Sequence, residues 1–552
     1  MDRSKLHARV RHSGVNPLVY WPLRAVLYPF FLIYFRLRWK GSKHIPKSGP
    51  VIIAANHRSF LDPFVISAMF WRPLYFVAKK ELFERNRLQT WFLNSLGAFP
   101  VDRGASDTDA MGSARHVLER GDAVVIFPEG TRIRPGGLGK PKRGVGRLAL
   151  ETGAPVVPVA VIGTENIRTK WKIRPHKVRM IAGKPLTFPQ TEQPTATMAA
   201  AVVDRVWPCV QLQWEWLGGE PPVRRAAIIG AGSWGTALAV ALARGGVDVQ
   251  LGARTPEQAA TIAETRHNDR YLPGIQLPDR VQPMTASQLD LERADLICLA
   301  VPSRAIPATV AAHAERIPAG AGVLVLSKGL VPPLGALPSA YVAERVNARA
   351  VATLGGPAIA SDMLANGAAV VLACTEPSCG AVIRDALRAA NLQVTVSTDV
   401  TGVELAGVAK NAAVLAAAAS VTAGPNAAGA AAGKVFAEVD RYARACGAQP
   451  ESFSGLAGAG DLVATVVAES SRNRRAGELL ARGVPADAIE PRLGQTPESL
   501  DTVALLADAL RRSGVHAPTI TALADLVGGR MAPDQWALSV TSPNPDRPTV
   551  AA

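Results

Sequence analysis

The chain contains little cysteine. Its five cysteines are odd in number, and no two are separated by only two residues: Cys209, Cys298, Cys374, Cys379 and Cys446. This pattern excludes a disulfide framework and a cysteine-rich zinc site. We therefore expect a protein of the reducing cytosol that uses no metal.

The N-terminal segment at residues 17–40 is apolar but lacks the length of a membrane span. Its run from Ala25 to Phe35 has 11 residues, whereas a spanning helix needs about 20. Arg24, Pro22 and Pro29 weaken a span further, and basic residues rather than a cleavage site follow the run. Aromatic residues with basic flanks favour an interfacial segment; the alternative is a helix packed on the domain behind it.

Acidic residues are scarce in the first part of this 552-residue chain. Residues 1–220 hold 33 Lys/Arg and 16 Asp/Glu, a net charge of +17, and the remainder holds 28 and 29, a net charge of −1. This asymmetry predicts modules with different partners, the first binding an anionic surface. Nucleic acid is not expected as that partner, because the aromatics cluster in the apolar segment instead of interleaving with a basic stripe. An anionic membrane surface fits better.

A histidine and a carboxylate follow the apolar run at residues 51–55. In "VIIAANHRSFLD" (51–62), His57 precedes Asp62 by five residues. Histidine can take a proton from a hydroxyl near neutral pH, and a carboxylate on its other ring nitrogen fixes the tautomer. The pair predicts a general base and its orienting group, although a loop histidine beside a helix-capping aspartate has the same spacing.

Three later stretches accompany this pair: "LGAFPVDR" (96–103), "FPEGTR" (127–132) and "APVVPVAV" (154–161). In this order, over roughly residues 20–215, the four stretches resemble the blocks of the glycerolipid acyltransferase family, which includes 1-acylglycerol-3-phosphate acyltransferase. The resemblance implies that His57 deprotonates an acceptor hydroxyl, which then attacks an acyl thioester, with Asp62 as orienter. It also implies an acceptor-phosphate site made by Arg103, Glu129, Gly130 and Arg132. A fold that has lost catalysis is the alternative.

A glycine-rich turn begins the second half, in "AAIIGAGSWGTALA" (226–239). Gly230, Gly232 and Gly235 form G-x-G-x-x-G between a strand-like and a helix-like stretch. The first glycine permits the tight turn, the second admits the pyrophosphate, and the third lets helix and strand pack. The next strand ends at Arg254 rather than at an acid, which favours NADP and leaves NAD open.

The motifs that follow resemble NAD(P)-dependent glycerol-3-phosphate dehydrogenase over about residues 225–530. They are "HNDRYLPGIQLP" (267–278), "AVPS" (300–303), "LSKGL" (326–330), "GGPAIA" (355–360), "DVTGVELAGVAKN" (399–411), "GLAGAGDL" (455–462) and "SSRNRR" (470–475). The resemblance implies reduction of dihydroxyacetone phosphate to sn-glycerol 3-phosphate by a Rossmann domain and an all-helical substrate domain. The oligomeric state stays open, and a homodimer is one alternative.

The same resemblance assigns site residues. Lys410, which lies in an apolar alanine-rich run, and Asp461 are the expected catalytic residues, with Lys410 as proton donor to the ketone. The expected substrate contacts are Lys328, Gly356, Asn411, Ser471, Arg472 and Asn473. The expected coenzyme contacts are Gly230, Gly232, Ser233, Trp234, Gly235, Arg254, Lys328, Ala360, Arg472 and Glu498.

Two positions depart from the dehydrogenase pattern. Ala358 stands where the family has Ser or Thr, which removes one polar substrate contact, and Lys434 stands where arginine is usual. These departures leave the expected catalytic set intact but affect the expected substrate affinity.

Strand-like runs alternating with helical stretches predict an α/β fold. We expect an acyltransferase α/β domain (1–216), a linker (217–225), a doubly wound Rossmann domain (226–401), a helical substrate domain (402–530) and a disordered tail (531–552). The expected protein is a bifunctional phospholipid-synthesis enzyme, peripheral on the inner face of the cell membrane. It takes acyl-CoA or acyl carrier protein as donor. The alternatives are an acyltransferase specific for lysophosphatidate beside an independent dehydrogenase, and a membrane-binding redox sensor.

Overall fold

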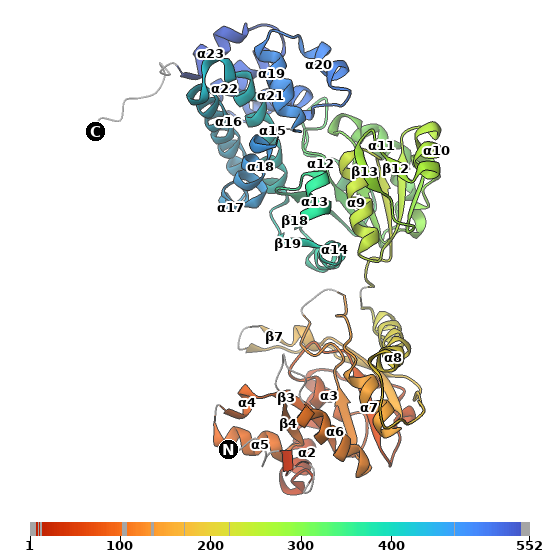
Figure 1. Ribbon diagram of the computed structural model, residues 1–552. Coiled ribbons are helices and arrows are strands. Elements are labelled where there is room, and N and C mark those ends of the chain that lie inside the picture. The colour runs from red at the N-terminus through yellow and green to blue at the C-terminus, as the bar shows by residue number, and fades with distance from the viewer. Residues whose placement is uncertain are drawn as a thin grey trace, which may run out of the picture. The chain divides into compact units, whose positions relative to one another are not determined.

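The computed structural model describes residues 7–8, 10, 14–84, 86–101, 108–133, 137–169, 172–219, 221–468 and 470–541. The chain divides into two compact units, Met1–Pro221 and Pro222–Ala552, and Figure 1 shows the elements of each. The division falls within the stretch predicted as a linker.

The first unit is built on a seven-stranded sheet in the order β1-β9-β6-β2-β5-β3-β4. All neighbouring pairs are parallel except β6 and β9. The strands are β1 (Arg38–Lys40), β2 (Val51–Ala55), β3 (Leu74–Lys79), β4 (Ala98–Val101), β5 (Ala123–Ile126), β6 (Val156–Ile162) and β9 (Arg179–Ala182). The four predicted strands of this unit are β2, β3, β5 and β6. The sequence pattern missed β1, β4 and β9.

Helices cover both faces of this sheet, because alternate residues of a strand point to opposite sides. Ile53 belongs to the apolar core that includes α2 residues, whereas Ile52 belongs to the core shared with α7 and α8. The helices are α2 (Pro17–Tyr34), α3 (Asp62–Ser67), α4 (Glu81–Glu84), α5 (Arg87–Ser95), α6 (Thr108–Glu119), α7 (Gly144–Thr152) and α8 (Ala196–Trp216). The short hairpin of β7 (Arg168–Thr169) and β8 (Lys172–Ile173) lies outside the main sheet.

The apolar N-terminal segment forms α2, and its prolines do not end the helix. One side of α2 is buried at Tyr20, Arg24 and Phe31. The other side exposes Leu18 at 86% and Ile33 at 79%. The helix therefore packs on the domain behind it and also presents a row of large apolar side chains outward.

The second unit begins with an eight-stranded sheet in the order β14-β11-β10-β15-β16-β17-β18-β19, in which only β17 and β18 are antiparallel. The strands are β10 (Arg225–Ile229), β11 (Asp248–Ala253), β14 (Val281–Thr285), β15 (Leu296–Leu299), β16 (Gly322–Val325), β17 (Ala350–Gly355), β18 (Ala368–Cys374) and β19 (Leu392–Ser397). The hairpin β12 (His267–Asn268) and β13 (Leu272–Gln276) is separate. The accompanying helices are α9 (Ser233–Arg244), α10 (Pro256–Thr265), α11 (Ile306–His313), α12 (Pro338–Ala343), α13 (Ala360–Asn366) and α14 (Pro377–Ala389). This doubly wound sheet confirms the predicted Rossmann domain.

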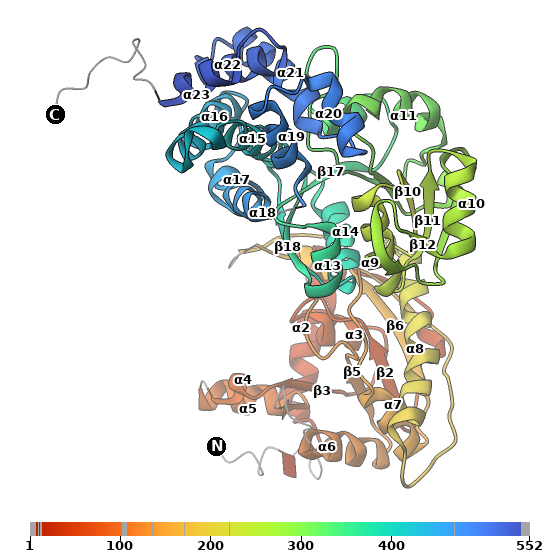
Figure 2. The same cartoon turned by 45° about the horizontal axis from the view of Figure 1, so that its top comes forward.

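The rest of the second unit is helical, as predicted, and lies beside the β17–β18 end of the sheet (Figure 2). Its helices are α15 (Val400–Ala419), α16 (Pro425–Ala445), α17 (Pro450–Ser454), α18 (Asp461–Val467), α19 (Arg472–Ala481), α20 (Ala486–Leu493), α21 (Glu498–Arg512), α22 (Pro518–Val527) and α23 (Pro533–Thr541). Helix α15 is at the centre and contacts α16, α18, α19 and α21. Among the described residues it alone has the length and apolarity of a membrane span, and 94% of that stretch is buried inside the protein.

The prediction of a disordered tail from residue 531 was wrong for its first part. Residues 533–541 form α23, whose Trp536 is fully buried and donates from Nε1 to Ser420 Oγ at 2.9 Å. A single large apolar side chain that fills a cavity outweighs the polar and proline-rich composition around it. Residues 542–552 lie outside the described residues.

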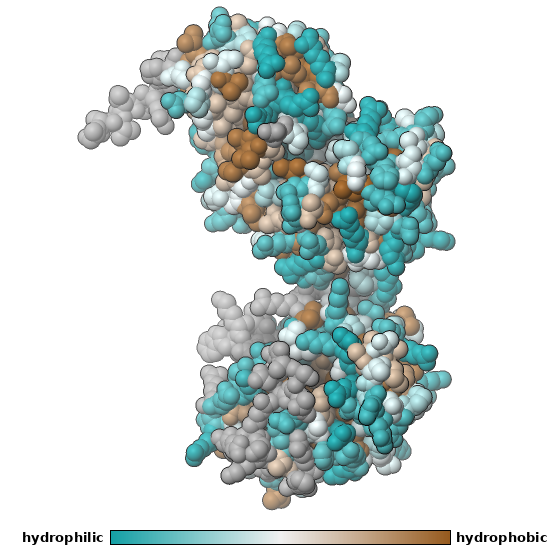
Figure 3. All heavy atoms as spheres, viewed as in Figure 1, coloured by the Kyte–Doolittle hydropathy of each residue, from teal (hydrophilic) through white to brown (hydrophobic). Residues whose placement is uncertain are grey.

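The surface is mostly hydrophilic on the face shown in Figure 3, with hydrophobic patches over the helical part of the second unit. The exposed large apolar residues of that part include Val463, Val467 and Leu538.

Candidate active sites

The candidate site of the first unit lies where β2 ends. His57 Nδ1 is 2.8 Å from Asp62 Oδ2, and Asp62, the first residue of α3, is fully buried. The same carboxylate oxygen accepts from the backbone N–H groups of Arg58 and Ser59, each at 2.7 Å. This turn fixes Asp62, and Asp62 in turn fixes the imidazole, so that Nε2 is left for a ligand. The geometry is that of a general base with its orienting group.

The strand stops on Asn56 because its side chain joins neighbouring strands. Asn56 Oδ1 accepts from Val161 N at 2.8 Å and Nδ2 donates to Val161 O at 2.9 Å, across to β6. His57 follows directly, with its ring stacked on Phe127 at 4.0 Å between centroids. The amide therefore ends the strand with all its polar groups paired and places the histidine at the sheet edge.

Glu129 lies next to the predicted base. Its carboxylate accepts from His57 N at 2.6 Å and from Gly139 N at 2.8 Å, and its predicted place in the floor of the phosphate pocket stays a prediction. Burial raises the pKa of Glu129 to about 7, although both backbone N–H groups oppose the rise. The side chain thus holds the histidine backbone and the following loop together.

The other residues predicted to bind the acceptor phosphate are Gly130, Arg132 and Arg103. Gly130 has a φ of +67°, and a Cβ there would come within 3.2 Å of the Lys142 side chain. Arg132 is exposed two residues later, where its guanidinium is open to an anionic ligand. Arg103 lies outside the described residues.

The three glycines of the second unit form a cradle at the start of α9. Gly230 has a φ of +116°, and a Cβ at Gly235 would collide with the carbonyl of Gly230. A Cβ at Gly232 would meet open space, so the backbone there is accessible to a ligand. Because Ser233 begins α9, its helix N-terminus also faces that space. This geometry fits the pyrophosphate of a dinucleotide.

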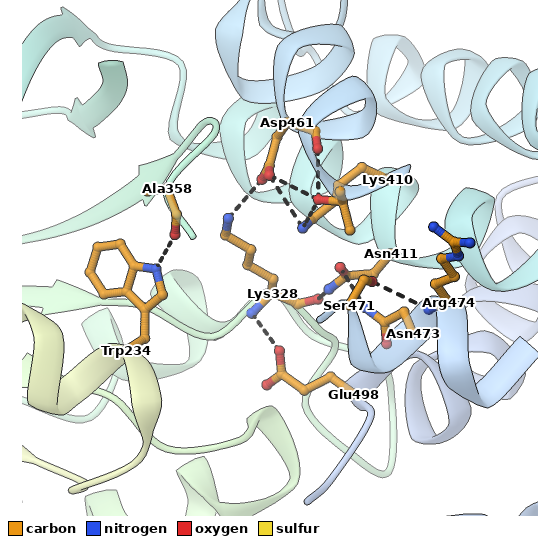
Figure 4. A network of polar contacts seen from close by, with 11 residues as sticks. Trp234, Lys328, Ala358, Lys410, Asn411, Asp461, Ser471, Asn473, Arg474 and Glu498 are labelled. Atoms are coloured by element: carbon orange, nitrogen blue, oxygen red, sulfur yellow. Dashed lines mark hydrogen bonds and ion pairs between the residues drawn. The ribbon is translucent and has the colours of Figure 1, made fainter. Parts of the chain in front are cut away.

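Two lysines and an aspartate form a polar cluster where the loop after β16 meets α15 and α18 (Figure 4). Lys328 Nζ is 2.7 Å from Asp461 Oδ2, and Lys410 Nζ is 3.3 Å from Asp461 Oδ1. Burial lowers the pKa of Lys410 to about 8; the Asp461 charge opposes this and the Lys328 charge adds to it. Burial alone would raise the pKa of Asp461, but the two ammonium groups outweigh it and lower the pKa. Lys410 is therefore poised to exchange a proton near neutral pH.

Thr465 belongs to this cluster and was not predicted. Lys410 Nζ donates to Thr465 Oγ1 at 3.0 Å, and Thr465 Oγ1 donates to the Asp461 carbonyl at 2.7 Å. The signal was its position four residues after Asp461, one helical turn along α18.

The amides of Asn411 and Asn473 link the cluster to α19 and α21. Asn473 Nδ2 donates to Asn411 Oδ1 at 2.8 Å, and Ser499 Oγ donates to Asn473 Oδ1 at 2.7 Å. Asn411 Nδ2 donates in turn to the Lys328 carbonyl at 3.0 Å. The predicted substrate residues Lys328, Asn411 and Asn473 therefore form one connected network.

The remaining predicted substrate contacts lie at helix starts and turns. Ser471 caps α19 by accepting from Arg474 N at 3.3 Å, and Arg472 is exposed beside it. Gly356 follows β17 with a φ of +109°, and a Cβ there would crowd β18.

The predicted coenzyme contacts outside the glycine cradle come from several elements. Trp234 Nε1 donates to the Ala358 carbonyl at 2.8 Å, and Ala360 begins α13. Arg254 is exposed at the end of β11. Glu498 accepts from Ser303 N at 3.1 Å and from Lys328 N at 3.2 Å, and so joins the loops after β15 and β16.

The two departures from the dehydrogenase pattern have separate structural consequences. Ala358 supplies its backbone carbonyl to Trp234, a contact that needs no hydroxyl. Lys434 Nζ donates to the Val540 carbonyl at 2.6 Å, so it fastens α23 to α16. Among the described residues, no cluster of three His, Cys, Asp or Glu residues suited to a metal is found.

Comparisons with known proteins match both units. The family described as Acyltransferase matches residues 36–162. The N- and C-terminal domains of NAD-dependent glycerol-3-phosphate dehydrogenase match residues 225–380 and 399–537.

Individual relatives match the second unit. The chain is 39% identical over 312 residues to a glycerol-3-phosphate dehydrogenase [NAD(P)+] of Deinococcus radiodurans, covering 55% of this chain and 91% of the relative. It is 37% identical over 303 residues to the corresponding protein of Corynebacterium kroppenstedtii, covering 54% and 91%. The crystal structure of glycerol-3-phosphate dehydrogenase from Coxiella burnetii aligns with a TM-score of 0.55 at 29% identity, covering 58% of this chain and 98% of that chain.

Proposed function

The chain belongs to the NAD-dependent glycerol-3-phosphate dehydrogenase family and also carries an acyltransferase domain, and we propose that its two units catalyse neighbouring steps of phospholipid synthesis. The second unit interconverts dihydroxyacetone phosphate and sn-glycerol 3-phosphate with NAD(P). The first unit transfers an acyl group from acyl-CoA or acyl carrier protein to a glycerol-3-phosphate-type acceptor.

The Lys328–Asp461–Lys410 cluster supports the mechanism of the reduction. The glycine cradle would hold the coenzyme, which would supply hydride to the ketone carbon of dihydroxyacetone phosphate. The ammonium of Lys410 donates its proton to the ketone oxygen, which becomes the hydroxyl of the product. Asp461 keeps Lys410 protonated despite its burial. Lys328 and the amide of Asn411 orient the substrate beside it.

The His57–Asp62 pair supports acyl transfer. His57 Nε2 takes the proton of the acceptor hydroxyl while the hydroxyl oxygen attacks the thioester carbonyl. The carbon–sulfur bond then breaks, and the thiol leaves with a proton returned by His57. Asp62 stabilises the intervening imidazolium through Nδ1. Arg132 is the described cation that best suits the acceptor phosphate.

Glycerol 3-phosphate is our preferred acceptor, because the second unit produces it on the same chain. A tether raises the local concentration of that intermediate. Lysophosphatidate is the second candidate acceptor, and the block pattern of residues 51–161 favours it.

A location on the cytoplasmic face of the membrane fits an enzyme whose product is a lipid. The first unit has a net charge of +17 over residues 1–220, and α2 exposes Leu18, Trp21, Val26 and Ile33. Exposed apolar side chains on a basic unit favour an anionic bilayer surface.

NADP is the preferred coenzyme in this proposal. The exposed guanidinium of Arg254 stands where dehydrogenases that select NAD carry an acid. In Arg254→Gln the ratio of kcat/KM for NADPH to that for NADH is expected to fall about tenfold or more; an unchanged ratio would remove Arg254 from this role.

One incubation tests the combined function. Purified protein receives dihydroxyacetone phosphate, NADH plus NADPH, and radiolabelled acyl-CoA, and the lipids are separated by chromatography. Labelled lysophosphatidate is expected, and it should disappear in both His57→Ala and Lys410→Met. Coenzyme oxidation without labelled lipid would contradict the glycerol-phosphate acceptor. A parallel incubation with 1-acylglycerol 3-phosphate then identifies lysophosphatidate as the acceptor if labelled phosphatidate forms.

A further inference from the structure

A buried arginine on α2 has donors without acceptors. Arg24 is 7% exposed, and its Nη2 donates to the Phe70 carbonyl at 2.5 Å. Its Nε and Nη1 are buried and have no hydrogen-bond partner among the described residues. Leaving charged donors unpaired in the interior is costly, because Nε and Nη1 have lost water without gaining an acceptor. Such a group indicates a missing anionic partner.

Arg24 forms part of the wall of a partly open cavity lined by residues of α2, α3 and β3. The lining is otherwise mainly apolar and includes Leu27, Phe31, Phe64 and Leu74. A cavity with apolar walls and one cation is suited to an amphiphile, since the chain and the anionic head of such a ligand each find a matching surface. None of the predicted catalytic residues lines this cavity.

A tyrosine hydroxyl adds a second polar group to the same wall. Tyr20 Oη accepts from Leu74 N at 3.3 Å and also interacts with the Arg24 side chain, while its own O–H is available to donate. Tyr20 is one helical turn before Arg24 on α2, and both line the cavity. A phosphate can accept from both side chains at once, because it presents several oxygens.

Two exposed tryptophans lie beside the Arg24 guanidinium. The guanidinium lies 4.9 Å from the ring centroid of Trp71 and 5.9 Å from that of Trp21. Trp71 is 73% exposed and Trp21 is 40% exposed, although both are large and mostly apolar. Exposed tryptophans are typical of the headgroup level of a bilayer, which is where a lipid phosphate lies.

We propose that this cavity binds one anionic phospholipid of the membrane, with its phosphate on Arg24 and Tyr20 and part of an acyl chain along the apolar lining. The proposal rests on the membrane-surface location proposed above, but not on the acyl-transfer reaction. It assigns Arg24 a specific lipid contact that is separate from the diffuse attraction of the basic first unit.

Vesicle flotation of the full chain separates these two kinds of attraction. The vesicles are phosphatidylcholine alone or phosphatidylcholine containing phosphatidylglycerol, each at low salt and at about 1 M salt, where the screening length falls to about 3 Å. Wild-type protein is expected to keep part of its binding to phosphatidylglycerol vesicles at high salt. Arg24→Gln is expected to lose that salt-resistant part by about tenfold or more. The matched control is Arg115→Gln, which removes an exposed arginine of α6 paired with Glu119 and is expected to retain it.

Equal salt-resistant binding by Arg24→Gln and wild type would overturn the Arg24 site. Hydrogen–deuterium exchange of the unmodified protein tests it without a variant and without a membrane. Soluble dihexanoyl phosphatidate is expected to slow exchange in residues 20–31 and 67–74, and dihexanoyl phosphatidylcholine is expected to have a smaller effect. No protection by phosphatidate, or equal protection by inorganic phosphate alone, would overturn the phospholipid site. Protection by phosphatidate without any vesicle binding would instead sustain the site and contradict the membrane location.

Discussion

Removing the negative charge of Asp461 is expected to shift the pH dependence of the dehydrogenase. Asp461 is 3% exposed and lies 2.7 Å from Lys328 and 3.3 Å from Lys410. At an effective dielectric constant of ~20, a charge pair at 3.3 Å is worth about 5 kcal/mol. Asparagine keeps a dipole at this position, so we expect about 3 kcal/mol of the stabilisation of protonated Lys410 to be lost, equivalent to a fall of about two pKa units.

The sign of the effect follows from the role of the ammonium. In the proposed mechanism the reduction of dihydroxyacetone phosphate needs protonated Lys410, so activity is expected to fall as the pH rises through the Lys410 pKa of about 8. In Asp461→Asn this fall in activity is expected near pH 6. At pH 7.5 the protonated fraction then falls about 25-fold, and activity should recover as the pH is lowered.

Steady-state oxidation of NADPH, followed by absorbance across the pH range, measures this shift. Asp508→Asn is the matched control, because Asp508 is a half-exposed residue of α21 that pairs with Arg511. In this control the pH at which activity falls should stay near that of the wild type. A loss of activity in Asp461→Asn that is the same at every pH would refute the reasoning, since it would mean that Asp461 does not act through the Lys410 charge.

Three further outcomes are expected. His57→Ala should lower acyl transfer by about 10²- to 10⁴-fold and leave coenzyme oxidation unchanged, as measured in the same preparation; a matching fall in oxidation would show that the units are not catalytically independent. Trp536→Ala should lower the free energy of unfolding by about 3–5 kcal/mol, measured by denaturant-induced loss of dehydrogenase activity. Leu538→Ala, on the exposed side of α23, should change it by less than about 0.5 kcal/mol, and equal effects would contradict the packing role of Trp536. Gly235→Ala should abolish coenzyme binding or folding because its Cβ meets the Gly230 carbonyl; isothermal titration showing normal NADPH affinity would contradict the cradle.

Local patterns predicted much of the fold. The βαβ unit around Gly230 was predictable because tight turns, helix starts and buried strands each have a residue signature within about 30 positions. The strands β1 and β9 were missed because "RWK" and "RMIA" are short and carry charges. Such strands exist because a neighbouring strand pairs with them, which a local pattern does not record.

The sequence predicted which residues belong to the candidate sites better than it predicted the hydrogen-bond partners of those residues. The resemblance led to Lys410 and Asp461, which the structure brings together, but Thr465 was missed because its signal, a position one helical turn after Asp461, becomes informative only once α18 is known. The hydrogen bonds of Glu129 to two backbone N–H groups were not predicted, because they join it to residues 72 positions before it and 10 positions after it. Trp536 could not be assigned from its surroundings, because its hydrogen-bond partner, Ser420, is 116 residues away.

The buried helix α23 also affects the order in which the two units can fold during synthesis. The first unit is complete by residue 221, whereas the core of the second unit lacks Trp536 until the last described helix emerges. At about 5–20 residues per second, the ribosome needs roughly half a minute to make the residues between these two points. The acyltransferase unit therefore has time to fold while the dehydrogenase is still being synthesised.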